Sequence, residues 1–115
     1  MEKFMYLFRG GMADGSPENM QAHMQKWYAW IERLKKENKY LAGEPLLPGG
    51  KSITTPKKTV TDGPVVEGKD LIGGFFIVNA KNYDEAVEMA KDCPDYQFGG
   101  SVEVRQVMKM KSLVN

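Results

Sequence analysis

The residues best suited to chemistry in this sequence are one histidine and two carboxylates in distinctive local contexts. Asp62 stands in the stretch "TDGP", Glu44 stands in "AGEPLL", and His23 is the only histidine of the chain. A carboxylate at the end of a strand can act as a general base when it is partly buried, because burial raises its pKa. Asp62 is therefore a candidate proton-transfer residue, and Glu44 could form a carboxylate pair with it.

Both carboxylates also have purely structural explanations. In "TDGP", the aspartate can accept a nearby backbone N–H, Gly63 permits a positive φ and Pro64 fixes the exit of a turn. That explanation needs no catalysis. Glu44 could equally be an ordinary surface glutamate, so both alternatives stay open at the level of sequence.

Histidine is the residue type whose ordinary pKa lies nearest to neutrality, and His23 is the only histidine of the chain. It flanks an apolar helical stripe, with Trp27 one turn further on and Trp30 two turns further on along the same edge. One interpretation is a weak catalytic candidate at the mouth of a pocket, with a tryptophan wall and a histidine that shuttles protons. The other is a boundary residue that packs against an aromatic neighbour.

The composition argues against several classes of function. A formal net charge of +1 gives no electrostatic case for binding nucleic acid or an anionic membrane surface. No apolar run approaches the roughly 20 residues of a membrane span. One histidine, one cysteine and scattered carboxylates show no metal-ligand spacing, so we expect neither a metal nor a cofactor. The single Cys93 excludes an intrachain disulfide, and we expect a cytoplasmic protein.

The elements that position these residues follow from periodicity and turn signals. We expect strands at 3–9, 39–47, 71–79 and 101–110, a hairpin at 51–54 and 57–62, helices from Pro17 to about Asn38 and from Asn82 or Asp84 to Pro94, and loops at 10–15 and 96–100. This order predicts a single domain over residues 1–115. It is the split βαβ of a ferredoxin-like α+β fold, an antiparallel sheet with both helices on one face and a hairpin insertion.

The strands at 3–9 and 71–79 are apolar on both faces. In a sheet with helices on one side only, apolar and polar residues should alternate along each strand. Exposing the second face would leave a large apolar patch, which is unusual in a monomer. We expect a second copy to cover it in a homodimer, sheet against sheet; the alternative is a lid formed by the insertion at 45–70. Tyr6, in the first strand, is a further candidate for ligand contact.

The last strand places charges on this same second face. If Val102 and Val104 meet the helices, Glu103 and Arg105 point away from them. Buried charges need partners, because their desolvation costs several kcal/mol. Either the two residues pair with each other and their neighbours, or Arg105 lines a polar cleft and binds an anionic group.

Four motifs spread over nearly the whole chain carry a family resemblance: "YLAGEPL", "VTDGPVVEGKDLIGGFFIV", "DEAVEMAKDCP" and "GGSVEVRQV". Together they resemble the YCII-related family, specifically its DGPF-type branch. The resemblance implies a dimeric α+β barrel, a fold shared with small isomerases, monooxygenases and dehydrochlorinases, without one agreed activity. Val65 and Gln106 replace the usual phenylalanine and proline. Related enzymes pair a histidine of the first helix with a carboxylate, but His23 lies about a turn early for that role.

Two functions from different classes follow. The first is an uncharacterised small-molecule-binding dimer, with its cleft between the sheet and the insertion loops. The alternative is a cofactor-independent enzyme, similar to an isomerase, dehydrochlorinase or lyase, that acts on a small aromatic or anionic substrate. In the enzyme, Asp62 moves protons, Arg105 holds an anionic group, and Trp27 or Trp30 forms the wall.

Overall fold

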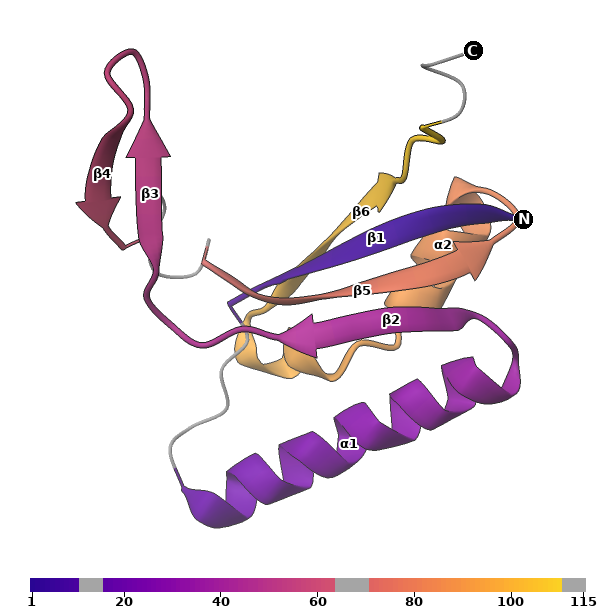
Figure 1. Cartoon of the computed structure of the whole chain (residues 1–115). Coiled ribbons are helices and arrows are strands. Elements are labelled where there is room, and N and C mark those ends of the chain that lie inside the picture. The colour runs from indigo at the N-terminus through magenta and orange to yellow at the C-terminus, as the bar shows by residue number, and fades with distance from the viewer. Residues whose placement is uncertain (11–15, 64–70, 111–115) are drawn as a thin grey trace.

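The chain folds into a four-stranded antiparallel sheet with helices, and a separate two-stranded sheet stands beside it (Figure 1). This computed structural model describes residues 1–10, 16–63 and 71–110. The strands are β1 (Glu2–Arg9), β2 (Tyr40–Pro45), β3 (Lys51–Thr54), β4 (Thr59–Asp62), β5 (Ile72–Ala80) and β6 (Ser101–Gln106). The helices are α1 (Pro17–Lys36), α2 (Tyr83–Ala90) and the 3-10 helix η2 (Pro94–Phe98).

This order confirms the ferredoxin-like α+β prediction, with corrections at three boundaries. The second helix ends at Ala90 instead of running to Pro94, and η2 occupies much of the predicted loop at 96–100. The last strand ends at Gln106 rather than at residue 110. The predicted loop at 10–15, the turn proline Pro64 and the substitution at Val65 lie wholly or almost wholly outside the described residues.

Local sequence signals account for the ends of α1 and α2. The Ser16 hydroxyl accepts a hydrogen bond from the backbone N–H of Asn19 at 3.2 Å, which makes Ser16 the N-cap that precedes Pro17. Asn38 follows α1 with a φ of 59°, as expected for a residue that tolerates the left-handed conformation. Asn82, the first of the two caps considered, accepts from the N–H of Glu85 at 2.9 Å and starts α2.

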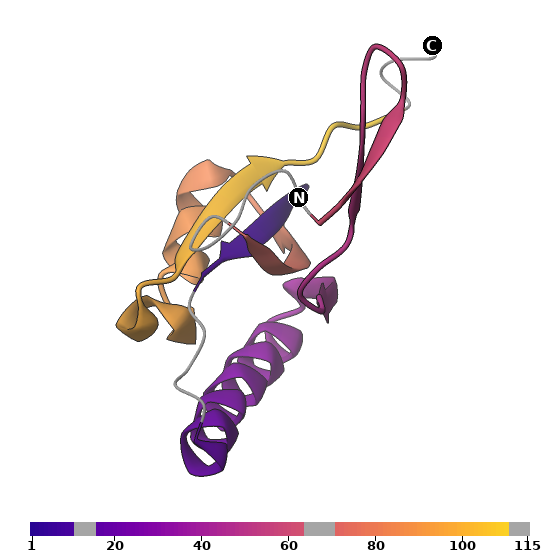
Figure 2. The same cartoon turned by 90° about the vertical axis from the view of Figure 1, so that its left-hand side faces the viewer.

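The four-stranded sheet has the order β2-β5-β1-β6, so β1 and β5 are its central strands. Alternate residues of these two strands face a common core. Both helices pack on this face, because their buried residues belong to the same cluster (Figures 1 and 2). The cluster comprises Phe4, Tyr6, Phe8, Trp30, Leu34, Phe76, Val78, Ala80, Ala86, Ala90 and Cys93.

Gly43 allows β2 to lie close to this aromatic core. A Cβ atom at this position would stand 2.5 Å from Cδ1 of Phe76 and 2.9 Å from the carbonyl oxygen of Phe75. Both distances are too short for any side chain, so a glycine is needed where β2 crosses the ring of Phe76. This close approach seats the outer strand against β5, the strand that faces Trp27 and Trp30 of α1.

The opposite face of the sheet carries the alternate residues of β1 and β5. Met5 lies opposite Ile77, and Leu7 lies opposite Phe75, and all four side chains are only half-buried. At the β6 edge, Glu103 accepts from Arg9 at 3.2 Å and from Arg105 at 3.3 Å, and these contacts hold the pKa of Glu103 below its usual range. Val102 and Val104 pack against the core on the other face, which is the arrangement considered from the sequence.

The strands β3 and β4 form the predicted hairpin as a sheet of their own. They pair from Lys51 opposite Asp62 to Thr54 opposite Thr59. The hairpin projects away from the four-stranded sheet in both views (Figures 1 and 2). Its large apolar side chains stay exposed, with Ile53 at 70% and Val60 at 58%. The described part of the insertion is therefore an arm and does not lie over the second face of the sheet.

Candidate functional site

The structure brings His23 into contact with a carboxylate of the short helix η2. Nε2 of His23 lies 2.7 Å from Oδ1 of Asp95, and the two side chains are only 10% and 11% exposed. Trp27, one turn along α1, directs its indole N–H at the same oxygen, with Nε1 at 3.0 Å from Oδ1 and at 3.1 Å from Nε2 of His23. Among the described residues, Asp95 is the one charged residue that is buried.

The backbone around η2 explains why the carboxylate faces α1. Pro94 opens η2, because its fixed φ suits the first helical position. Gly99 ends the helix with a φ of 79°, and the N–H of Gly100 donates to the carbonyl of Asp95 at 3.0 Å. Both ends of the short helix are thus held, which keeps Asp95 against the residues of α1.

These contacts select one arrangement of protons when Asp95 is ionised. If Nε2 of His23 carried a lone pair, two acceptors would face each other at 2.7 Å, which is repulsive. A proton on Nε2 removes this repulsion and makes a charge-assisted hydrogen bond to the carboxylate. The indole N–H of Trp27 then donates to the same Oδ1. The neutral imidazole keeps its free lone pair on Nδ1.

Burial controls the electrostatics of the pair. The apolar surroundings raise the pKa of Asp95 above its ordinary value, and the hydrogen bonds from Trp27 and His23 oppose that rise. Nδ1 of His23 is buried without a hydrogen-bond partner among the described residues. A buried nitrogen without a hydrogen-bond partner is costly to maintain, and most such atoms in folded proteins are paired.

Aromatic rings fix the orientation of the pair. The His23 imidazole meets the edge of Phe98 with ring centroids 4.9 Å apart. Trp27 meets Phe8 edge-on with ring centroids 4.9 Å apart, and its ring is tilted against that of Trp30 at 5.4 Å. His23 is therefore packed against aromatic neighbours, as one of the two sequence interpretations held. What the sequence reasoning missed is Asp95, 72 residues away, whose only local signal is its place after Pro94 in "DCPDY".

The structure places Asp62 elsewhere. Its carboxylate lies on the hairpin, 89% exposed, and accepts from Nζ of Lys51 at 2.5 Å. Gly63 has the positive φ expected of a turn, 85°, and its N–H donates to the carbonyl of Gly50. Partial burial is what raises the pKa of a carboxylate base. Asp62 lacks such burial in this structure, and its catalytic role stays a prediction.

Glu44, Arg105 and Tyr6 are not brought together with the pair. Glu44 lies on β2 opposite Phe75 and is exposed, and within the described residues no hydrogen bond or ion pair joins it to Asp62. Arg105 pairs with Glu103, which is the mutual pairing considered from sequence. Tyr6 is a fully buried core residue, and its hydroxyl donates to the carbonyl of Ala86 at 2.5 Å. Ligand contacts by Glu44, Arg105 and Tyr6 stay predictions.

The described residues offer neither a metal site nor a membrane-spanning helix. No group of three or more histidine, cysteine or acidic side chains within ranges 1–10, 16–63 and 71–110 could hold a metal ion. In the same ranges, no helix is both long enough and apolar enough to cross a membrane. Burial raises the pKa of the Cys93 thiol to about 12, so this buried cysteine is unreactive at neutral pH.

The comparisons with known proteins agree with this fold. No curated protein matches the chain. Among solved structures, the chain is similar to 5-chloro-2-hydroxyhydroquinone dehydrochlorinase (TftG) from Burkholderia phenoliruptrix AC1100, in complex with 2,5-dihydroxybenzoquinone. The two share 22% sequence identity with a TM-score of 0.51 over 97% of this chain and 98% of the other, a level at which the likeness shows the fold. The model of the YCII-related domain matches residues 4–111, and the chain therefore belongs to the YCII-related family.

Proposed function

We propose that the protein binds a small molecule and that His23, held by Asp95, accepts a proton from it. The observation that carries this proposal is the buried contact of 2.7 Å between Nε2 and Oδ1, together with the unpartnered Nδ1. Asp95 fixes the proton on Nε2, which leaves Nδ1 as the basic atom. The carboxylate also stabilises the imidazolium that forms when Nδ1 takes up the proton.

The fold neighbour suggests the first compounds to test. Its name states that it is a dehydrochlorinase, and its structure holds a dihydroxybenzoquinone. Loss of hydrogen chloride includes removal of a proton, which is the step a positioned imidazole can perform. We therefore take hydroxylated quinones and hydroquinones as the starting ligand class, as a choice of probe rather than as an assigned substrate.

A second candidate, a binding protein without turnover, is favoured by one observation. The His23 side chain is only 10% exposed and its Nδ1 is fully buried, so a ligand reaches that atom only if the structure opens. In a pure binding protein, the pair would serve to hold η2 against α1. The two candidates differ in whether loss of Nδ1 affects turnover or only affinity.

We further propose that two copies associate through the open face of the sheet. The half-buried side chains of Met5, Leu7, Phe75 and Ile77 form one contiguous apolar surface there. Such a surface is costly in water, and a two-fold copy of itself would cover it. We also propose that the chain belongs to the DGPF-type branch of the family. A cytoplasmic location is proposed as well, because the single cysteine is a free, buried thiol.

The proposed function is tested by comparing the wild type with His23→Gln. Glutamine can still donate to Asp95 but offers no basic nitrogen, so we expect the ligand-induced rise in melting temperature to persist. We expect the rate of turnover of any compound that reacts to fall by about 10²- to 10⁴-fold. Equal turnover in both proteins would contradict the catalytic role, and binding without turnover in either would support the second candidate.

A further inference from the structure

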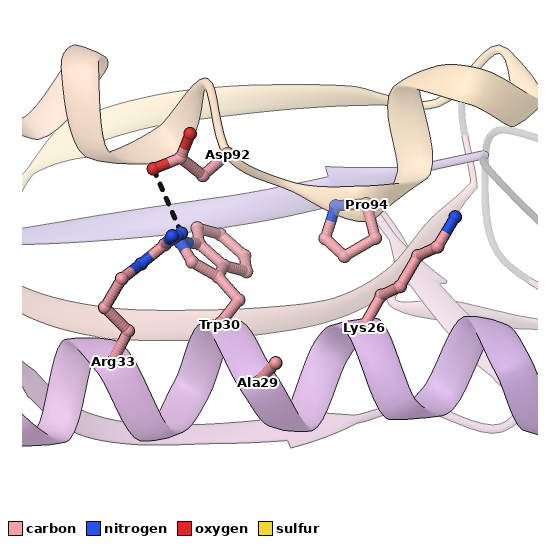
Figure 3. Close-up of a pocket in the computed structure, with 6 residues that line it drawn as sticks. All are labelled: Lys26, Ala29, Trp30, Arg33, Asp92 and Pro94. Atoms are coloured by element: carbon pink, nitrogen blue, oxygen red, sulfur yellow. Dashed lines mark hydrogen bonds and ion pairs between the residues drawn. The ribbon is translucent and has the colours of Figure 1, made fainter.

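A pocket of about 280 Å³ lies between α1 and the segment that joins α2 to η2 (Figure 3). Four of its lining residues, Lys26, Ala29, Trp30 and Arg33, come from α1, and Asp92 and Pro94 come from the joining segment. In Figure 3 the indole of Trp30 rises from α1 between Arg33 on one side and Lys26 on the other. Neither His23 nor Asp95 lines this pocket.

The indole N–H of Trp30 is the feature of the pocket that indicates a ligand. Trp30 is 2% exposed, and its Nε1 is buried without a hydrogen-bond partner among the described residues. An indole nitrogen can only donate, so the group that would satisfy it must be an acceptor. A buried donor left unpaired is unfavourable, and most such donors in folded proteins are paired.

The charged residues at the rim of the pocket indicate that this acceptor is negatively charged. Arg33 and Lys26 bring two cations to the pocket, against the single carboxylate of Asp92. Arg33 makes one hydrogen bond to Asp92 at 3.1 Å, and a guanidinium has five N–H donors, so donors remain for a ligand. Nζ of Lys26 lies 3.5 Å from Gln97, the outer limit for a hydrogen bond. An anionic oxygen fits these donors best.

The remaining lining surfaces are apolar. The indole ring of Trp30, the methyl group of Ala29 and the pyrrolidine ring of Pro94 provide flat or small hydrophobic walls. The volume of about 280 Å³ lies just below that of most small-molecule sites, which run from roughly 300 to 1,000 Å³. A molecule with one ring therefore fills the space, and its charged group can reach the donors.

We propose that this pocket is a binding site for the carboxylate of a single-ring aromatic acid, separate from the pair of His23 and Asp95. The carboxylate accepts from Arg33 and, once the lining side chains move to uncover the buried Nε1, from the indole N–H of Trp30. The ring packs against Pro94 and Ala29. This inference goes beyond the proposed function, because it assigns a second site and requires no proton transfer. Binding here survives changes that disable the pair.

The test is a titration of the full chain with benzoate, followed by the indole N–H signals in nitrogen-15 NMR. The chain has two tryptophans, so there are two indole signals, and Trp30→Phe identifies the one from Trp30. We expect a saturable shift of the Trp30 signal larger than that of Trp27. Benzamide, a neutral molecule of the same shape, is expected to bind at least about tenfold more weakly, because charged acceptors make the stronger hydrogen bonds.

Two variants of equal net charge separate specific recognition from general attraction. Arg33→Gln removes a donor of the pocket and frees the carboxylate of Asp92, so we expect the affinity for benzoate to fall at least about fivefold. Lys36→Gln removes a cation of the same helix that does not line the pocket, and we expect a change of less than twofold. Arg33 is 54% exposed, so its replacement is not expected to prevent folding.

Four outcomes would overturn the inference. These are the absence of a saturable shift, equal effects of Arg33→Gln and Lys36→Gln, a shift confined to the signal of Trp27, and loss of benzoate binding in Asp95→Asn. Asp95→Asn completes the set, because it disables the pair and leaves the lining of the pocket unchanged. Benzoate binding that persists in Asp95→Asn supports a separate site, and binding lost there shows that the pocket and the pair are one site.

Discussion

Replacing Asp95 with alanine is expected to lower the free energy of unfolding by about 2–4 kcal/mol. The change removes the acceptor shared by the indole N–H of Trp27 and Nε2–H of His23. Even when Nε2 instead accepts from Trp27 at 3.1 Å, the imidazole keeps one buried N–H without an acceptor, and the lost carboxylate leaves a cavity. Each unsatisfied donor costs about 1–3 kcal/mol. For a domain of this size the loss corresponds to a fall in melting temperature of roughly 8–15 °C, which calorimetry or circular dichroism measures directly.

Asp95→Asn is the matched control for this prediction. The amide oxygen can still accept from Trp27 and His23, and no charge is buried, so we expect a stability at pH 7 within about 1 kcal/mol of the wild type or above it. Any turnover should nevertheless be lost, because an amide does not stabilise an imidazolium. A variant as unstable as Asp95→Ala would show that the negative charge itself holds the structure together.

The pH dependence of stability has a definite sign in this comparison. Burial makes the pKa of Asp95 higher in the folded chain than in the unfolded chain, where a carboxyl titrates near about 3.9. Folding therefore takes up a proton between these two values, and the wild type loses stability relative to Asp95→Asn as the pH rises through that window. Above the folded-state pKa, the difference between the two proteins becomes constant.

Ile77→Glu is expected to convert a dimer into a monomer, with a dissociation constant at least about 100-fold higher than in the wild type. Ile77 lies opposite Met5 and Ala42 at the middle of the open sheet face and is half-buried in the single chain. In a monomer the new carboxylate can remain in water, whereas in a dimer it is buried without a partner at a cost of several kcal/mol. Sedimentation velocity at micromolar concentration measures the change.

Val87→Glu supplies the control for this dimer prediction. Val87 is an exposed apolar residue of α2, at 40%, on an element that packs against the core face of the sheet. It introduces the same charge away from the open face, so the oligomeric state should not change. A wild-type monomer, or a dimer that tolerates Ile77→Glu, would contradict the association of two copies through this face.

The fold could be predicted because its signals are local. Ser16 and Pro17 mark the start of α1, and Asn38 marks its end, and each acts through its own backbone conformation. The helix η2 was not predicted, because five residues are too few for a hydrophobic period to show and Gly99 resembles an ordinary loop residue. Asp95, near the start of η2, nevertheless forms the candidate site together with His23.

The candidate site could be predicted only in part, for a physical reason. Sequence reasoning singled out His23, Trp27 and Trp30, since residues one turn apart on a helix share an edge. Their partner Asp95 is distant in sequence, and only the packing of η2 against α1 brings it within 2.7 Å. Asp62, by contrast, was a candidate because of a local turn motif. Such a motif does not indicate whether the carboxylate is buried, and the structure places it on an exposed hairpin.

The most direct measurement is nitrogen-15 NMR of the imidazole of His23, at a pH where the ring is neutral. Because His23 is the only histidine, its ring signals need no assignment by mutagenesis. Proton transfer through Nδ1 requires the tautomer with the proton on Nε2, held by Asp95, and we predict that this tautomer dominates in the wild type. A ring that carries its proton on Nδ1, with Nε2 accepting from Trp27, would contradict the proposed base.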